Sequence, residues 1–219
     1  VHRFWEQTGN FYARGMGNDN ITDPFIGLSA MPAVSSLFRD MTGIRFEHPE
    51  FIPENCTACG SCYTVCPDTA IPGLVSDFGD VMDTVVKRVK KSHDKVEVLP
   101  KAVRTLETKL RSLINENTNG GGAAMGDFLD EAIEQTVASA NGNAAKYQEE
   151  FDWFKEELGD FKFAITKPYY NNLEKKNTNS GGLFSITINP YTCKGCNECV
   201  AVCDDDALRT VTQTDKSIE

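Results

Sequence analysis

All eight cysteines of this 219-residue chain fall into two short runs, and their placement restricts the possible folds more than any other property of the sequence. The first run, CTACGSCYTVCP, holds Cys56, Cys59, Cys62 and Cys66, and the second, CKGCNECVAVCD, holds Cys193, Cys196, Cys199 and Cys203. No cysteine is left over, which excludes a scattered disulfide framework. With no signal-peptide pattern ahead of them, the runs indicate metal binding in a reducing compartment.

The spacing C-x2-C-x2-C-x3-C, present in both runs, is the bacterial iron-sulfur pattern. Three thiolates spaced three residues apart can meet three corners of one cuboidal cluster if the backbone makes a tight turn, and such a turn also aims N–H groups at the sulfurs. Gly60 and Gly195 stand where the backbone would wrap most closely. Zinc is the alternative, but zinc ribbons favour two separated C-x2-C pairs. The sequence therefore predicts two 4Fe-4S clusters.

The fourth cysteine of each run lies too far round the turn to close its own cluster, and in two-cluster ferredoxins it binds the other one. We therefore predict the ligand sets Cys56, Cys59, Cys62 and Cys203 for cluster 1, and Cys193, Cys196, Cys199 and Cys66 for cluster 2. This crossing would hold the two halves together across the 126 residues from 67 to 192.

Apolar residues around the two runs also correspond. Ile52 precedes the first run and Ile188 the second, while Ala70-Ile71 and Ala207-Leu208 follow the last cysteine of each run at the same distance. These matches predict an internal duplication with pseudo-twofold symmetry.

One difference between the runs carries a charge, because Asp204 stands where the first run has Pro67. A carboxylate next to Cys203 would disfavour the more negative, reduced state of cluster 1. The hypothesis is that Asp204 helps to separate the two reduction potentials; the alternative is a solvated acidic turn.

The predicted fold class is α+β, a bacterial-type two-cluster ferredoxin-like domain split by a long, mainly helical insertion. We expect a connector to a larger protein at 1–49, the ferredoxin-like domain at 50–75 plus 183–213, the insertion at 76–182 and a tail at 214–219. Apolar spacing predicts helices near 31–42 and 77–91, from Pro100 to the polar NENTNGGG, near 124–140, and around Tyr147 to Leu158; strands are expected at 161–166 and 183–188. So small a core would depend on its clusters for stability.

Charge and hydropathy limit the partners. The net charge of -10 and the pI near 4.8 argue against nucleic acid, whose phosphates require basic patches. No stretch approaches the ~20 apolar residues of a membrane helix, so a cytoplasmic location is expected. The chain begins with Val rather than Met, and we expect it to be a segment of a longer polypeptide.

The segments EFIPENCTACGSCYTVCPDTAI and INPYTCKGCNECVAVCDDDAL resemble the two-cluster ferredoxin domain of pyruvate:ferredoxin and related 2-oxoacid:ferredoxin oxidoreductases. The resemblance covers roughly residues 44–75 and 186–210. Two features depart from the family pattern: the insertion is longer than usual, and the second run lacks the proline.

The resemblance implies a CoA-acylating enzyme in anaerobic metabolism, whose thiamine diphosphate, Mg and coenzyme A are bound on other parts of a homo-oligomeric parent. This chain, which shows no substrate-converting residues, would carry electrons from pyruvate or 2-oxoglutarate to ferredoxin or flavodoxin. The alternatives are an electron-transfer subunit of a hydrogenase- or formate-linked complex, and a non-redox interaction module stapled by clusters.

Overall fold

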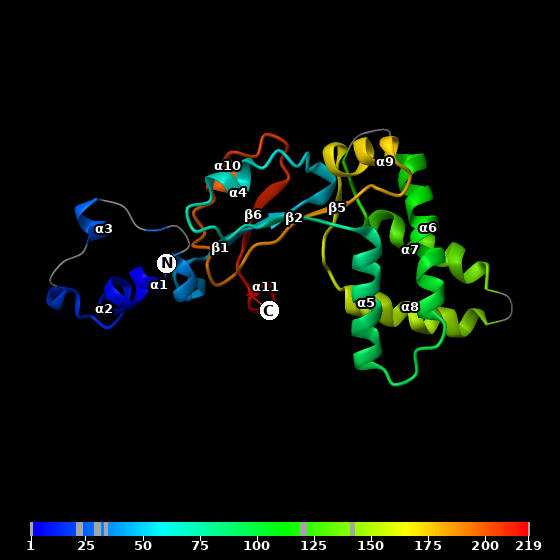
Figure 1. The fold of residues 1–219 in the computed structure, drawn as a ribbon, viewed down its shortest axis with the longest axis horizontal. Helices are drawn as coiled ribbons and strands as arrows, with labels where there is room; N and C mark the ends of the chain where they lie inside the picture. Colours follow the sequence, from blue (N-terminus) through cyan, green and yellow to red (C-terminus); the bar gives the residue numbers. More distant parts are fainter. Residues whose placement is uncertain are drawn as a thin grey trace.

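The computed structural model describes residues 2–20, 24–28, 32, 35–118, 122–140 and 143–218. Along its longest axis, an N-terminal segment, a central part with small antiparallel sheets and a helical part follow one another (Figure 1). The mixture of helices and small sheets agrees with the predicted α+β class. None of the helices within these described residues is long and apolar enough to cross a bilayer.

The central part is built from two matching halves that are interrupted by the helical part. Its elements are β1 (Glu47–Phe51), η5 (Pro53–Asn55), α4 (Ser61–Val65), β2 (Gly73–Ser76), β5 (Leu183–Ile186), α10 (Glu198–Ala201) and β6 (Leu208–Thr212). Strand β1 pairs with β6, and β5 pairs with β2, both antiparallel. Each half therefore completes its sheet with a strand from the other half.

The predicted internal duplication is confirmed by the registers of these strand pairs. Pro49 lies opposite Thr210 in one sheet, and Ile186 lies opposite Gly73 in the other. Pro49 and Ile186 are 137 positions apart in the sequence, and so are Gly73 and Thr210. The same interval separates the two cysteine runs. Under this relation Ile188 corresponds to Phe51. The match of Ile188 with Ile52 that the sequence indicates is therefore displaced by one residue.

Hydrogen bonds between the halves follow the same symmetry. The backbone N–H of Ile52 donates to the carbonyl of Ala207, and that of Asn189 donates to the carbonyl of Ala70, both at 2.8 Å. Each bond ties the chain that leads into one cysteine run to the chain that leaves the other run. The two runs are thereby held against each other by the backbone itself.

The helical part leaves the central part after β2 and returns before β5. It contains α5 (Phe78–Ser92), α6 (Leu99–Asn117), α7 (Gly126–Ala138), α8 (Ala144–Leu158), η6 (Lys167–Asn171) and α9 (Asn172–Lys176). The predicted helices of this region are confirmed, and their apolar faces form one buried core, with Phe78, Leu106 and Phe154 fully buried. Asp77 begins α5 as an N-cap that accepts hydrogen bonds from two backbone N–H groups. Half of the segment NTNGGG that follows α6, residues 119–121, lies outside the described residues.

Two short strands join the helical part to the central sheet. They are β3 (Ala123–Ala124) and β4 (Ala164–Ile165), and they give the sheet the order β2-β5-β4-β3. The strand predicted at 161–166 is reduced to β4, because only Ala164 pairs with β5, while Phe161 lies outside the sheet with 45% of its surface exposed. The strand predicted at 183–188 ends at Ile186.

The described residues of the N-terminal segment do not form the helix predicted at 31–42. Its elements are α1 (His2–Phe4), η1 (Trp5–Gly9), α2 (Asn10–Ala13), η2 (Gly17–Asp19), α3 (Pro24–Gly27), η3 (Ser35–Phe38) and η4 (Thr42–Ile44); α11 (Asp215–Ile218) forms the tail. The prediction is wrong beyond Phe38, and positions 31, 33 and 34 lie outside the described residues. Asp40 accepts hydrogen bonds from the N–H and hydroxyl of Thr42, a local turn that competes with a helix.

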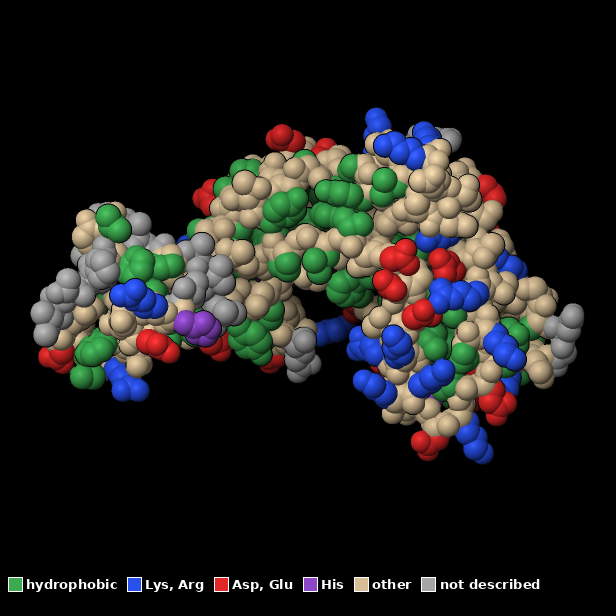
Figure 2. Space-filling model, viewed as in Figure 1, with side chains coloured by type: hydrophobic (Ala, Val, Ile, Leu, Met, Phe, Trp, Pro, Cys, Tyr) green, Lys and Arg blue, Asp and Glu red, His purple; other side chains and the backbone are tan. Residues whose placement is uncertain are grey.

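The surface of the central part differs from that of the helical part. Figure 2 shows hydrophobic side chains gathered over the central part, whereas Lys, Arg, Asp and Glu crowd the helical part on the same face. Exposed apolar residues of the central part include Tyr63, Leu74 and Val75. Leu74 and Val75 belong to β2, which is an edge strand of its sheet.

Candidate metal centre

The first cysteine run forms a tight loop between η5 and α4. Ala58 and Gly60 have φ values of +59° and +84°, and these left-handed residues turn the backbone around the cysteines. Gly60 is also the N-cap of α4, the helix that carries Cys62. Cys56 and Cys62 are buried, while Cys59 is exposed.

The second run repeats this loop at equivalent positions. Gly195 and Asn197 have φ values of +73° and +58°, and Asn197 is the N-cap of α10. Cys193 and Cys199 are buried and Cys196 is exposed, in the same order as in the first loop. A β-carbon at Gly195 would stand 2.5 Å from the carbonyl oxygen of Glu47, so the loop packs closely against β1.

The fourth cysteine of each run faces the other run's loop. One cavity is lined by all four of the thiols Cys56, Cys59, Cys62 and Cys203. Cys66 is in turn close enough to Cys193 and Cys199 to raise the pKa of both thiols, after the larger effect of burial. The structure thus brings the cysteines together in the two crossed sets that the sequence predicts. Assignment of these sets as cluster ligands stays a prediction.

Burial governs the protonation of the inner thiols. It raises the pKa of Cys56 to about 11 and that of Cys199 to about 12, and it also raises the pKa of Cys62 and Cys193. The exposed Cys59 differs, because hydrogen bonds with Ser61 lower the pKa of its thiol. Loading such a site with iron therefore releases protons from buried thiols, since the ligand is the thiolate.

Backbone N–H groups point at the sulfurs. Ala70 donates to Cys66 at 3.3 Å, Ala207 donates to Cys203 at 3.2 Å, and Ala58 donates to Cys56 at 3.4 Å. The first two bonds are equivalent under the 137-residue relation, and each follows a left-handed residue, Thr69 or Asp206. Such donors offset negative charge on thiolate sulfur, which is what an iron-sulfur site requires.

The arrangement suits a cluster better than a single ion. Within the described residues, no three His, Cys, Asp or Glu side chains lie close enough together to share one metal ion. A 4Fe-4S cluster binds each thiolate at a different iron, so its ligands surround a volume and do not meet at one point. Four thiols around one cavity, with N–H donors aimed at sulfur, fit that group.

Charged residues differ between the two loops. At the first loop, Asp205 accepts a hydrogen bond of 2.6 Å from the Thr57 hydroxyl beside Cys59. At the second loop, Lys194 forms an ion pair with Asp68, with 3.5 Å between Nζ and the carboxylate oxygen. Asp204, which the sequence suggested as the influential acid, is exposed, and the acid that contacts the first loop is its neighbour Asp205. The effect of Asp204 on the potentials stays a prediction.

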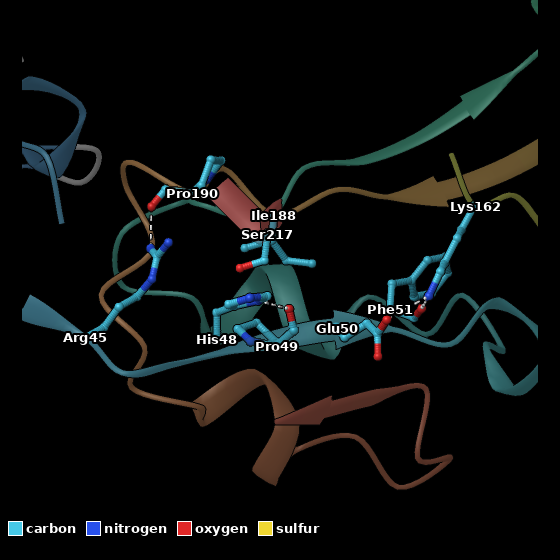
Figure 3. A pocket seen from close by; sticks show the side chains of 9 residues that line it. All are labelled: Arg45, His48, Pro49, Glu50, Phe51, Lys162, Ile188, Pro190 and Ser217. Carbon is cyan, nitrogen blue, oxygen red and sulfur yellow. Dashed lines mark hydrogen bonds and ion pairs between the residues drawn. The ribbon is translucent and has the colours of Figure 1, made fainter. Parts of the chain in front are cut away.

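Arg45 is a residue of this site that the sequence did not indicate. It comes just before β1, is only 6% exposed, and donates hydrogen bonds to the carbonyls of Pro190 and Cys193. Figure 3 shows it at one end of a hollow along β1, with Lys162 at the other end beside Glu50. No local motif marks Arg45, because its partners lie about 145 residues away in sequence.

Comparisons with known proteins agree with the class of site. Two family models, each described as a 4Fe-4S binding domain, match residues 49–71 and residues 190–205. Neither a curated protein nor a solved structure matches the chain. The matches are consistent with a two-cluster ferredoxin domain and support iron-sulfur electron transfer.

Proposed function

We propose that this chain is the ferredoxin-like electron-transfer module of a thiamine-diphosphate-dependent 2-oxoacid:ferredoxin oxidoreductase. Cluster 1 is bound by Cys56, Cys59, Cys62 and Cys203, and cluster 2 by Cys193, Cys196, Cys199 and Cys66. When bound, such clusters accept and release one electron at a time. The observation that carries the proposal is the crossed grouping of thiols in two equivalent loops.

The residues of the chain hold and shield the two sites. Buried apolar side chains pack around the cysteines from both halves, among them Phe51, Ile71, Phe184, Ile186 and Leu208. They belong to the same buried group as Cys56, Cys62 and Cys199, so the two sites share one small core. This core excludes water from the inner sulfurs.

The place of the module in a larger enzyme rests on the family resemblance of its two cysteine segments. Thiamine diphosphate, Mg and coenzyme A are bound by other domains or subunits of a homo-oligomeric cytoplasmic enzyme, where the 2-oxoacid is decarboxylated and the acyl group is transferred. Electrons then pass through this chain to ferredoxin or flavodoxin. The exposed Cys59 and Cys196 mark the sides of the two sites that face outward.

The test uses the assembly that contains this chain, purified without oxygen. Pyruvate or 2-oxoglutarate is added together with coenzyme A, and iron-sulfur absorbance and electron paramagnetic resonance are followed. Bleaching with one acid, and signals from two reduced clusters, are expected, and the active acid identifies the substrate. If neither acid reduces the clusters while dithionite does, the chain belongs to another redox enzyme.

A further inference from the structure

The two thiol sites are matched in most of the properties that set a reduction potential. The inner cysteines of both loops are buried, the middle cysteines Cys59 and Cys196 are exposed, and the fourth cysteines Cys66 and Cys203 are half-buried. The N–H bonds to Cys66 and Cys203 are equivalent and nearly equal in length. Solvent exposure and backbone donors therefore favour neither site, so the side chains distinguish them. Ser61, which hydrogen-bonds with Cys59, is replaced by Glu198 in the second loop, and the charged side chains around the two sites differ as well.

The site of Cys56 has an acidic surround. The segments 54–62 and 203–206, which enclose it, contain four acidic residues and no basic one: Glu54, Asp204, Asp205 and Asp206. Asp205 is fixed against the loop by its hydrogen bond from Thr57, and its charge acts on the Cys59 thiol. A donor hydroxyl satisfies one oxygen of this carboxylate but leaves its negative charge unbalanced.

The corresponding segments around the site of Cys193, 191–199 and 66–69, are closer to neutral. They contain two acidic residues, Glu198 and Asp68, and Lys194 forms an ion pair with Asp68. Lys194 has no counterpart in the first loop, where the equivalent position is Thr57.

Arg45 adds a buried positive charge to this second site. Its guanidinium donates to the carbonyl of Pro190 (Figure 3) and to that of Cys193, and its Nε donates to the side-chain oxygen of Gln213 at 2.6 Å. Hydrogen bonds from Thr42 and, to a smaller extent, the charge of Arg45 lower the pKa of Asp40, which is fully exposed. No ion pair joins Arg45 to an acidic side chain within the described residues. The position equivalent to Arg45 is Gly182, so the first site has no such charge.

We infer that the Cys193 site has the higher reduction potential and that electrons cross from the Cys56 site to the Cys193 site. Adding an electron makes a site more negative, which a buried guanidinium stabilises and an unbalanced carboxylate opposes. In each crossing, one electron leaves the first site and one arrives at the second, without a proton. The electron is supplied by the decarboxylated 2-oxoacid and taken up by ferredoxin or flavodoxin. The inference rests on the proposed two-cluster function.

The test is a potentiometric titration of the full chain, loaded with clusters under anaerobic conditions and followed by electron paramagnetic resonance. Arg45→Gln removes the buried charge and is expected to shift the higher-potential step downward. Asp205→Asn keeps the acceptor for Thr57, removes the carboxylate charge and is expected to shift the lower-potential step upward. Each variant is therefore expected to reduce the difference between the two reduction potentials, Arg45→Gln by lowering the higher one and Asp205→Asn by raising the lower one. Arg88→Gln, the same charge loss on α5 of the helical part, should move neither step.

The results distinguish an error in the order of the two reduction potentials from an error in the proposed presence of two clusters. If Arg45→Gln lowers the lower step, or if Arg45→Gln and Asp205→Asn both leave the two steps unchanged, the inferred order is wrong. If Arg45→Gln does not retain its clusters, Lys194→Gln replaces it, since that side chain is on the surface and its loss should also lower the higher step. A wild-type chain that takes up fewer than two electrons from dithionite would instead refute the proposed two-cluster function.

Discussion

At the scale of single residues, the cysteine loops depend on left-handed backbone positions that are only partly occupied by glycine. Gly60 and Gly195 could be recognised from the sequence, because glycine within a ligand loop indicates a close wrap. Ala58 and Asn197 occupy the equivalent positions with φ of +59° and +58°. Asparagine adopts this conformation more readily than most residues, but alanine gives no sign of it in the sequence. The sequence thus indicates only some of the residues that shape the loops.

Gly195→Ala tests the closeness of the second loop to β1. The equivalent residue of the first loop, Ala58, carries a β-carbon at a similar φ, so the dihedral alone is tolerable. The added methyl would, however, meet the carbonyl of Glu47 and the Cβ of Arg45. We expect a loss of about 2 kcal/mol from strain and overpacking, measured as cluster bleaching at a lower denaturant concentration than in wild type.

Gly15→Ala is the matched control for this prediction. Gly15 has the same φ of +73°, but a β-carbon there meets nothing within 4 Å. The control carries the dihedral strain without the contact, in a segment away from the cysteines. Equal cluster stability in Gly195→Ala and wild type would show that the loop does not pack as described.

At the scale of elements, helix α6 begins at a carboxylate from a distant helix. Glu150 of α8 is fully buried and accepts hydrogen bonds from the backbone N–H groups of Glu97, Val98 and Leu99 at 2.7 to 3.2 Å. These N–H groups have no partner within the helix, and the positive end of the helix dipole favours an anion there. This contact orients α8 against α6.

Glu150→Gln is expected to destabilise the helical part by about 2 kcal/mol, because hydrogen bonds to an ionised acceptor are the stronger kind and the amide offers one acceptor oxygen in place of two. The measurement is the urea midpoint of the helical circular dichroism signal. Glu149→Gln, a neighbouring change at an exposed position, should leave the midpoint unchanged. Matching midpoints for the two variants would mean that the buried carboxylate does not stabilise the α6 start.

The helices of the insertion were predictable because each has one continuous apolar face, as with Met82, Val85, Val86 and Val89 of α5. The N-terminal segment was not predictable in this way, because its apolar residues contact one another through aromatic rings. The ring centroids of Phe38 and Trp5 are 5.1 Å apart, and those of Phe4 and Phe25 are 4.8 Å apart. A period alone does not reveal contacts of this kind. The Glu150 contact was likewise beyond prediction, because Glu150 lies in an acidic stretch typical of a solvated face.

At the scale of the whole molecule, the described residues form two separate buried cores. One lies among the helices of the insertion, extends to Leu183 of β5 and contains no cysteine, while the other surrounds the thiols. The core around the thiols is small and includes cysteines among its buried residues, so its stability depends on what those cysteines bind. The insertion can bury its apolar faces without that support.

Removing iron with a chelator should therefore unfold the central part and leave the helical part folded. We expect most of the helical circular dichroism signal to remain, while amide hydrogen exchange becomes fast in β1, β2, β5 and β6. The measurement is exchange resolved by segment, before and after chelation. Loss of protection in α5 to α8 at the same rate would contradict the independence of the two cores.

The central claim is that crossed cysteines hold two 4Fe-4S clusters. Its most direct test is to measure iron, zinc and acid-labile sulfide per chain after anaerobic purification, and to record the electron paramagnetic resonance spectrum after reduction with dithionite. The claim predicts equal iron and sulfide, enough for two clusters, and a spectrum of two magnetically coupled centres. Bound zinc without sulfide, or the spectrum of a single isolated cluster, would contradict it.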